Sequence, residues 1–97
     1  MEWLFSKEIP IEAQYLYRKA LEMEKQGKIE IALKYFRQTV MIAPNYAKAF
    51  HEMGNCFALL GRYDEAIIKY DQAIHIDPLA TEPRVKKDLI LNKNHKA

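Results

Sequence analysis

The stretch 47–78 constrains the fold of this chain more than any other, because its apolar residues keep a helical spacing that one glycine interrupts. From Ala47 to Leu60 the apolar side chains recur at intervals of three and four, which predicts an amphipathic helix. Gly61 is expected to end this helix, since a residue without Cβ can take a left-handed cap at little cost. A second amphipathic helix follows and stops at Pro78. The stretch therefore predicts two packed helices joined by a short turn.

The preceding part of the chain repeats this pattern at a distance of 34 residues. A shift of that length aligns Gly27 with Gly61 and Pro44 with Pro78. It also aligns several residues between and beside these markers: Ala13 with Ala47, Ala32 with Ala66, Phe36 with Tyr70, Gln38 with Gln72 and Ile42 with Ile76. A helix over 11–26 and a second helix that ends before Pro44 are thus expected, and the chain contains an internal repeat.

These residues resemble the tetratricopeptide repeat (TPR) pattern, W-x2-L-G-x2-Y…A-x3-F…P. The second unit fills its apolar, glycine, aromatic, small and proline positions with Phe50, Met53, Gly54, Phe57, Ala66, Tyr70, Ala73 and Pro78. The first unit departs from the pattern at Leu16, Lys19, Ala20, Met23 and Thr39. The resemblance implies an all-α fold of antiparallel helical hairpins in a short right-handed superhelix, with repeats at about 13–46 and 47–80.

The two ends of the chain carry different signals within what we expect to be a single domain, 1–97. Residues 1–12 form an N-terminal extension with three large apolar side chains, Trp3, Leu4 and Phe5. These side chains are expected either to cap the first helix of their own chain or to dock on another copy and make a homo-oligomer, in its groove or against an unpaired repeat end.

Residues 81–97 are expected to form a C-terminal capping helix that covers the open end of the second repeat. Thr81 is its expected N-cap, and fraying is expected from Asn92 onward. The helix is predicted to carry its apolar residues on one side and its lysines on the other: Val85, Leu89 and Leu91 against Lys86, Lys87 and Lys93.

Composition narrows the function classes. A net charge of +2 is too small to imply a polyanionic partner, so nucleic-acid binding through the basic last helix is the weakest alternative. Cys56 stands alone, so the chain forms no internal disulfide, and we expect a buried thiol in a cytoplasmic protein. The sequence holds no catalytic triad order, phosphate loop or metal motif. We therefore expect no catalysis, no cofactor, no metal and no membrane-spanning segment.

The resemblance to TPR proteins also implies that the first helix of each hairpin lines a concave groove for a peptide or a partner helix. Carried onto this sequence, the groove positions are Gln14, Tyr17, Leu21, Glu24, Lys48, His51, Asn55 and Leu59, with Val85 and Leu89 completing them. Among these, Leu59 offers apolar contact, Asn55 both donates and accepts hydrogen bonds, and Lys48 carries a positive charge.

Two further expectations concern the occupant of that groove. TPR co-chaperones grip the C-terminal carboxylate of chaperones with Lys and Asn side chains, at positions that correspond here to Tyr17, Leu21 and Glu52. None of the three matches, and Glu52 repels a carboxylate, so we do not expect this ligand. A protein or peptide partner is expected instead; the alternative is a self-assembling unit whose groove is filled by its own N-terminal residues.

Overall fold

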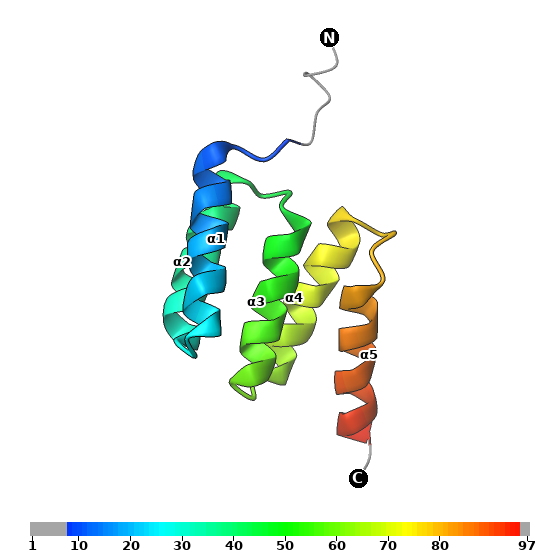
Figure 1. Ribbon diagram of the computed structural model, residues 1–97. Helices are drawn as coiled ribbons and strands as arrows, with labels where there is room; N and C mark the ends of the chain where they lie inside the picture. The colour runs from blue at the N-terminus through cyan, green and yellow to red at the C-terminus, as the bar shows by residue number, and fades with distance from the viewer. Residues whose placement is uncertain (1–7, 96–97) are drawn as a thin grey trace.

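The computed structural model describes residues 8–95, and this part of the chain folds into helices without any strand (Figure 1). The expected all-α fold of helical hairpins is confirmed. The first hairpin pairs α1 with α2, the second pairs α3 with α4, and α5 follows alone at the C-terminal end. The helices run over Ile11–Lys25 (α1), Ile29–Ile42 (α2), Ala47–Leu59 (α3), Tyr63–Ile76 (α4) and Glu82–His95 (α5).

Each hairpin turns at a glycine in the left-handed conformation. The φ angles are 79° at Gly27 and 76° at Gly61, positive values that a side chain rarely tolerates. After each glycine the next N–H donates to a carbonyl five residues earlier, from Lys28 to Met23 and from Arg62 to Phe57, at 2.9 Å in both cases. This is the Schellman arrangement, which satisfies carbonyls left unpaired at a helix end. The internal repeat in the sequence thus produces the same glycine turn in both hairpins.

One hydrophobic core runs through both hairpins and reaches α5. Its largest buried side chains include Phe36 of α2, Met53 of α3 and Tyr70 of α4, and Ile90 joins it from α5. Alanines with no exposed surface let neighbouring helices approach closely: Ala13, Ala20, Ala32, Ala49 and Ala66. Each hairpin buries its apolar face against the next element. The stability of the fold therefore depends on the stacked hairpins together and not on a single helix.

Two residues that depart from the repeat pattern, and one lone thiol, fit this core without strain. Thr39 is fully buried, and its hydroxyl donates to the carbonyl oxygen of Tyr35 at 2.8 Å. Lys19 is half-buried, with Nζ 3.9 Å from a carboxylate oxygen of Glu22. Cys56 is fully buried as expected, and burial raises the pKa of its thiol to about 12. The thiol therefore behaves as a small apolar group.

The structure corrects the prediction for the last helix. Val85 and Leu89 are 53% and 56% exposed, whereas Ile90 is 7% exposed and packs on the core. Lys87, expected on the far side, reaches back to Asp71 with Nζ 2.8 Å from Oδ1. The face of α5 that carries Ile90 is thus the buried one, because this face packs on α4 at the open end of the second hairpin. The helix continues to His95.

The expected roles of Trp3, Leu4 and Phe5 lie outside the described residues. The chain enters α1 at Ile9, whose carbonyl oxygen accepts a hydrogen bond from Gln14 Nε2 at 2.7 Å. At the other end, the carbonyl oxygen of Thr81 accepts from the N–H of Val85 at 3.0 Å, as an N-cap residue does. No helix within residues 8–95 is both long and apolar enough to cross a bilayer.

Candidate interaction groove

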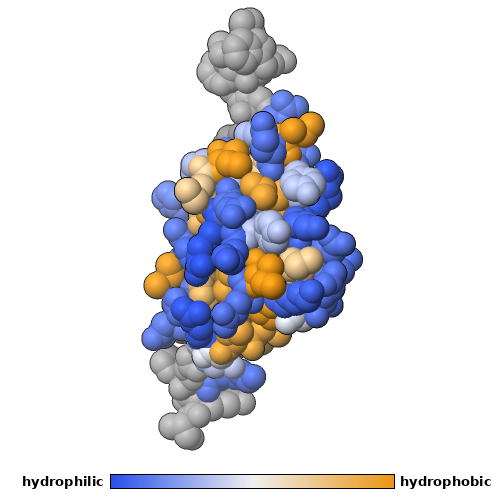
Figure 2. Space-filling model, turned by 90° about the vertical axis from the view of Figure 1, so that its left-hand side faces the viewer, coloured by the Kyte–Doolittle hydropathy of each residue, from blue (hydrophilic) through white to orange (hydrophobic). Residues whose placement is uncertain are grey.

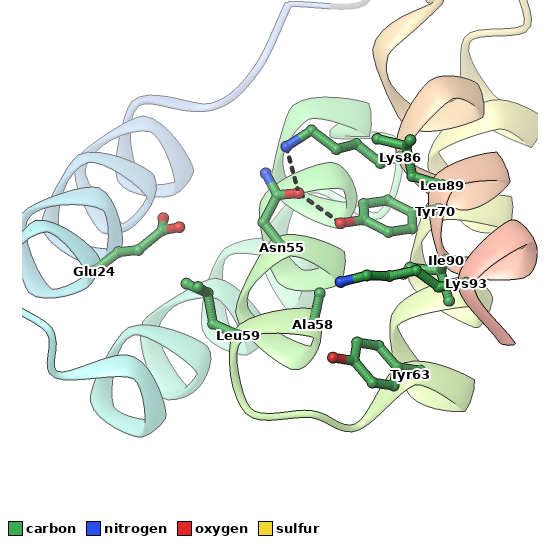
Figure 3. Close-up of a pocket in the computed structure, with 10 residues that line it drawn as sticks. All are labelled: Glu24, Asn55, Ala58, Leu59, Tyr63, Tyr70, Lys86, Leu89, Ile90 and Lys93. Atoms are coloured by element: carbon green, nitrogen blue, oxygen red, sulfur yellow. Dashed lines mark hydrogen bonds between the residues drawn. The ribbon is translucent and has the colours of Figure 1, made fainter. Parts of the chain in front are cut away.

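A groove of about 420 Å³ opens between α1, α3 and α5. Its lining comes from all three helices and from the outer hairpin partner α4: Glu24, Asn55, Ala58, Leu59, Tyr63, Tyr70, Lys86, Leu89, Ile90 and Lys93 (Figure 3). Leu59 and Leu89 are mostly exposed there, at 65% and 56%, although each is a large apolar side chain. The groove therefore offers apolar surface that no described residue covers.

Asn55 is held in place at the centre of this groove. Its Oδ1 accepts a hydrogen bond from the hydroxyl of Tyr70 at 2.6 Å and a longer one from Lys86 Nζ at 3.5 Å. Its Nδ2 donates to Glu52 at 3.3 Å. Burial raises the pKa of Tyr70 to about 12, so this hydroxyl stays a donor at neutral pH. Fixed on three sides, the amide presents its remaining N–H in a defined direction, which is useful for recognition.

Two carboxyl groups meet on the α1 side of the groove. Partial burial and the charge and hydrogen bonding of the Glu52 carboxyl raise the pKa of Glu24 to about 7, and Lys86 opposes this shift. The carboxyl of Glu24 is therefore partly protonated near neutral pH, because burial and the adjacent Glu52 charge both disfavour its ionised form. The α5 side carries the opposite sign, with Lys86 and Lys93 extending towards α3 (Figure 3).

The structure separates the predicted groove residues into several groups. Glu24, Asn55, Leu59 and Leu89 line the groove together. Lys48 and His51 line a smaller recess of about 120 Å³ beside the start of α5. Val85 is exposed but lines neither space.

The remaining predicted positions on α1 are engaged in packing. Tyr17 stacks on Tyr46, with ring centroids 4.8 Å apart, and lies 5.8 Å from the ring of Phe36. Leu21 is half-buried against the core. The amide of Gln14 donates to the chain that enters α1, as described above. None of these three side chains lines the groove.

His51 has an unusual surrounding for a polar side chain. Its Nε2 is buried and has no hydrogen-bond partner among the described residues, and its ring lies 5.8 Å from that of Tyr70. Burial lowers the pKa of this imidazole. The ring is therefore neutral at pH 7 and contributes apolar contact to the recess that it shares with Lys48.

Sequence reasoning placed Leu89 of α5 in the groove but missed the other lining residues of that helix and Tyr70. The repeat shift of 34 residues, carried one unit further, places Ile90 on buried Cys56 and Lys93 on Leu59 of the groove. That extension would have found the buried face of α5 and its groove side. The hydroxyl of Tyr70 had no such signal, because the repeat pattern marks its position as a core aromatic.

The described residues show no cluster typical of a metal site. Within residues 8–95 no three His, Cys, Asp or Glu side chains gather where a cation would be held. The lysines of α5 also do not form one basic patch, since Lys86 faces Asn55 while Lys87 pairs with Asp71. The groove is thus suited to contact with another polypeptide through apolar and charged groups.

Family models for the tetratricopeptide repeat match residues 13–46 and 47–78. An uncharacterized protein of Methanocaldococcus jannaschii, MJ0572, is 29% identical over 76 residues, which are 78% of this chain and 88% of that protein. The small glutamine-rich tetratricopeptide repeat-containing protein 2 of Mycosarcoma maydis is 28% identical over 79 residues. These cover 81% of this chain but only 22% of the fungal protein.

Solved structures share the fold. The MamA RS-1 ArsTM double mutant superposes with a TM-score of 0.84 at 21% identity, over 90% of this chain and 49% of that one. The type III secretion translocator chaperone SycD of Yersinia enterocolitica gives a TM-score of 0.80 at 24% identity, over 84% of this chain and 61% of that one. The chain therefore spans 49% and 61% of these two larger structures.

Proposed function

Because this chain belongs to the tetratricopeptide repeat family of protein–protein interaction modules, we propose that it binds a peptide or a partner helix in the groove between α1, α3 and α5, without catalysis. The observation that carries this proposal is the coexistence of exposed apolar side chains with a fixed amide. Leu59 and Leu89 stand uncovered on either side of Asn55, whose orientation three neighbours determine.

The chemistry of the groove suits a segment with large apolar side chains. A volume of about 420 Å³ admits a few side chains and not a whole domain. An apolar group of the partner packs between Leu59 and Leu89, and removal of that surface from water stabilises the complex. The free N–H of Asn55 donates to a backbone carbonyl of the partner, which sets the register of the bound segment.

The proposal extends to the cellular setting and to the absence of chemistry. A cytoplasmic location is supported by a single, fully buried Cys56, whose thiol has no partner for a disulfide within the chain. The lack of catalysis is supported by the family, because tetratricopeptide repeats typically act as interaction modules without catalysis.

The direct test is selection of peptides from a displayed random library against the intact chain, followed by affinity measurement on purified variants. Leu59→Arg and Leu89→Arg place a charged, bulky side chain on opposite walls of the groove. Each is expected to weaken the selected peptides at least about tenfold, because a desolvated apolar contact is lost. The matched control is Ile68→Arg on α4, where an apolar residue of similar exposure, 54%, lies outside the groove.

Circular dichroism and thermal unfolding first establish that the three variants fold like the parent. Peptides that bind both groove variants with parental affinity, or that lose affinity only with Ile68→Arg, would place binding elsewhere and contradict the proposal.

A further inference from the structure

The groove has a charge order that runs across the stack. Lys86 and Lys93 stand on the α5 side, and Lys93 has no ion-pair partner within the described part of the chain. Leu59, Leu89 and Ile90 form the apolar floor between Lys93 and the carboxyl pair of Glu24 and Glu52, while the ammonium of Lys86 reaches Asn55 at the centre of the groove. Figure 3 shows the two ammonium groups directed from α5 towards α3, with Glu24 across the groove from them.

The first seven residues of the chain carry the complementary order. Their sequence, MEWLFSK, places acidic Glu2 before the apolar run of Trp3, Leu4 and Phe5, and basic Lys7 after it. Matched to the groove, Glu2 meets Lys93 of α5, the apolar run covers the floor, and Lys7 meets the carboxyl pair, in which Glu24 comes from α1 and Glu52 from α3. A cation beside Glu24 also removes the repulsion that the two carboxyls suffer in the free groove.

We propose that this groove binds residues 1–7 of a second copy of the chain. The inference rests on the groove proposed above and names its occupant. Two copies that exchange these segments reciprocally form a closed dimer, in which each groove is filled by the partner and no binding surface is left over.

The reach of the chain excludes the same pairing within one copy. Ile9 is tied to the beginning of α1 by Gln14, and Glu24 lies 15 residues further along, about 22 Å at the rise of an α-helix. Lys7 precedes Ile9 by two residues, which span about 7 Å even when extended. Lys7 therefore meets Glu24 only across two copies.

The exposed end of the first hairpin is a weaker docking surface for a second copy. Figure 2 views this end, and its apolar groups stand as separate spots among hydrophilic ones. The exposed large apolar residues of α1 and α2 are accordingly scattered: Ile11, Tyr15, Ile31, Met41 and Ile42. No charge order that matches another part of the chain accompanies them. The groove has both an apolar floor and charges complementary to residues 1–7, so it is the better docking surface for this segment.

Trp3 is the sole tryptophan, so its fluorescence reports on the segment directly in the intact protein. We expect the molar mass, measured by light scattering, to rise from 11.4 kDa towards twice that value with concentration. The emission of Trp3 is expected to shift to shorter wavelength over the same concentration range, because the indole leaves water on association.

Charge reversal on each side tests the pairing itself. One variant carries Glu2→Lys with Lys7→Glu, and a second carries Glu24→Lys with Lys86→Glu and Lys93→Glu. Each alone is expected to associate at least about tenfold more weakly than the parent. An equimolar mixture is expected to regain association, because the reversed segment of one variant then faces the reversed groove of the other, and the two parental surfaces face each other.

The control variant is Lys34→Glu on α2, which changes the net charge by the same amount as the groove variant and lies outside the groove. It is expected to associate like the parent. Helical content and unfolding temperature of every variant are compared before association is interpreted.

Three results would overturn the inference. They are a chain that stays monomeric with water-exposed Trp3, a monomer with buried Trp3 at every concentration, and an oligomer that neither charge reversal weakens. In each case the peptides selected against the groove decide the proposed function separately. If those peptides bind the groove, the function stands with a foreign partner, and if they do not, both proposals fall.

Discussion

The two hairpins share one backbone plan but differ where their helices touch. In the second hairpin, Gly54 lies so close to Tyr70 that a Cβ on the glycine would stand 2.5 Å from the tyrosine ring. The equivalent residues of the first hairpin, 34 positions earlier, are Ala20 and Phe36. The missing methyl group lets the ring of Tyr70 lie against α3, and the hydroxyl of that ring donates to Asn55. A contact inside the core therefore decides the polar chemistry of the groove.

The same comparison holds at the groove surface. The equivalent of Asn55 is Leu21, which packs on the core, and the equivalent of Glu24 is Ala58, which forms part of the floor. The first hairpin thus contributes charge to the groove, while the second contributes apolar surface and a fixed amide. The two repeats are alike as scaffolds and distinct as binding surfaces, so exchanging residues between equivalent positions tests the difference directly.

The largest effect is expected from Gly54→Ala, which gives the second hairpin the residue of the first. The added methyl group forces the buried ring of Tyr70 to move, and we expect a loss of about 3 kcal/mol in the free energy of unfolding. The reverse exchange, Ala20→Gly, is expected to cost only about 1 kcal/mol, through helix propensity. Urea unfolding measures both, and equal losses would show that the close contact at Tyr70 is not special.

A smaller loss is expected from Tyr70→Phe, which gives the second hairpin the aromatic residue of the first. The variant keeps the ring and removes the donor to Asn55, so the free energy of unfolding should fall by about 1.5 kcal/mol. Selected peptides should also bind more weakly, because Asn55 loses the bond that orients it. If the variant kept both the stability and the peptide affinity of the parent, the hydrogen bond from Tyr70 would not be what orients Asn55 for binding.

Glu24→Gln, at the charged position of the first hairpin, should stabilise the chain by about 1 kcal/mol at pH 8. This value is reduced from the full pKa shift because the side chain is only half-buried and solvent screens it. The pKa of Glu24 is raised to about 7 in the fold, so between its ordinary value and pH 7 the folded chain binds more protons than the unfolded chain. Stability contributed by this group is therefore lost as pH rises through that window.

Urea unfolding of parent and Gln variant at pH 8, 6 and 4.5 checks this sign. The advantage of the variant should be largest at pH 8 and should nearly vanish at pH 4.5, where the carboxyl is protonated in the folded chain and about half protonated in the unfolded chain. Glu52→Gln removes the neighbouring charge that raises the pKa of Glu24 and should flatten the same dependence. If the Gln variant were instead stabilised more at acidic pH than at pH 8, the raised pKa of Glu24 would be contradicted.

The smallest effect concerns the turn of each hairpin. Arg62 holds Glu65 through two hydrogen bonds, of 2.6 and 2.8 Å, and its guanidinium lies 4.9 Å from the ring centroid of Phe57. Arg62→Lys, which copies Lys28 of the first hairpin, should cost about 0.5 kcal/mol, since this pair is exposed. The opposite exchange, Lys28→Arg, should change nothing, because the equivalent of Glu65 there is Ile31. Thermal unfolding at low and high salt compares the two.

Much of the fold was predictable from local patterns. Helix ends at Gly27 and Gly61, the two hairpins and the buried Cys56 all follow from periodicity and turn chemistry, which act over a few residues. The residues that line the groove were harder to predict. The resemblance to TPR proteins placed Asn55 and Leu59 near a groove, but it also included Lys48 and His51, which line a separate recess. Spacing along one helix does not tell which neighbour covers which residue.

The amino-acid sequence by itself determined the repeat, its two glycine turns and the all-α fold, because these depend on the spacing of apolar groups and on the backbone freedom of single residues. Only the tertiary structure decided how the groove is charged, and it showed which apolar residue of α5 is buried. Val85, Leu89 and Ile90 are all apolar, yet only Ile90 is buried against the second hairpin, and the other two side chains remain exposed. The choice depends on the fit between helices, and that fit brings Lys86 and Tyr70 together at Asn55.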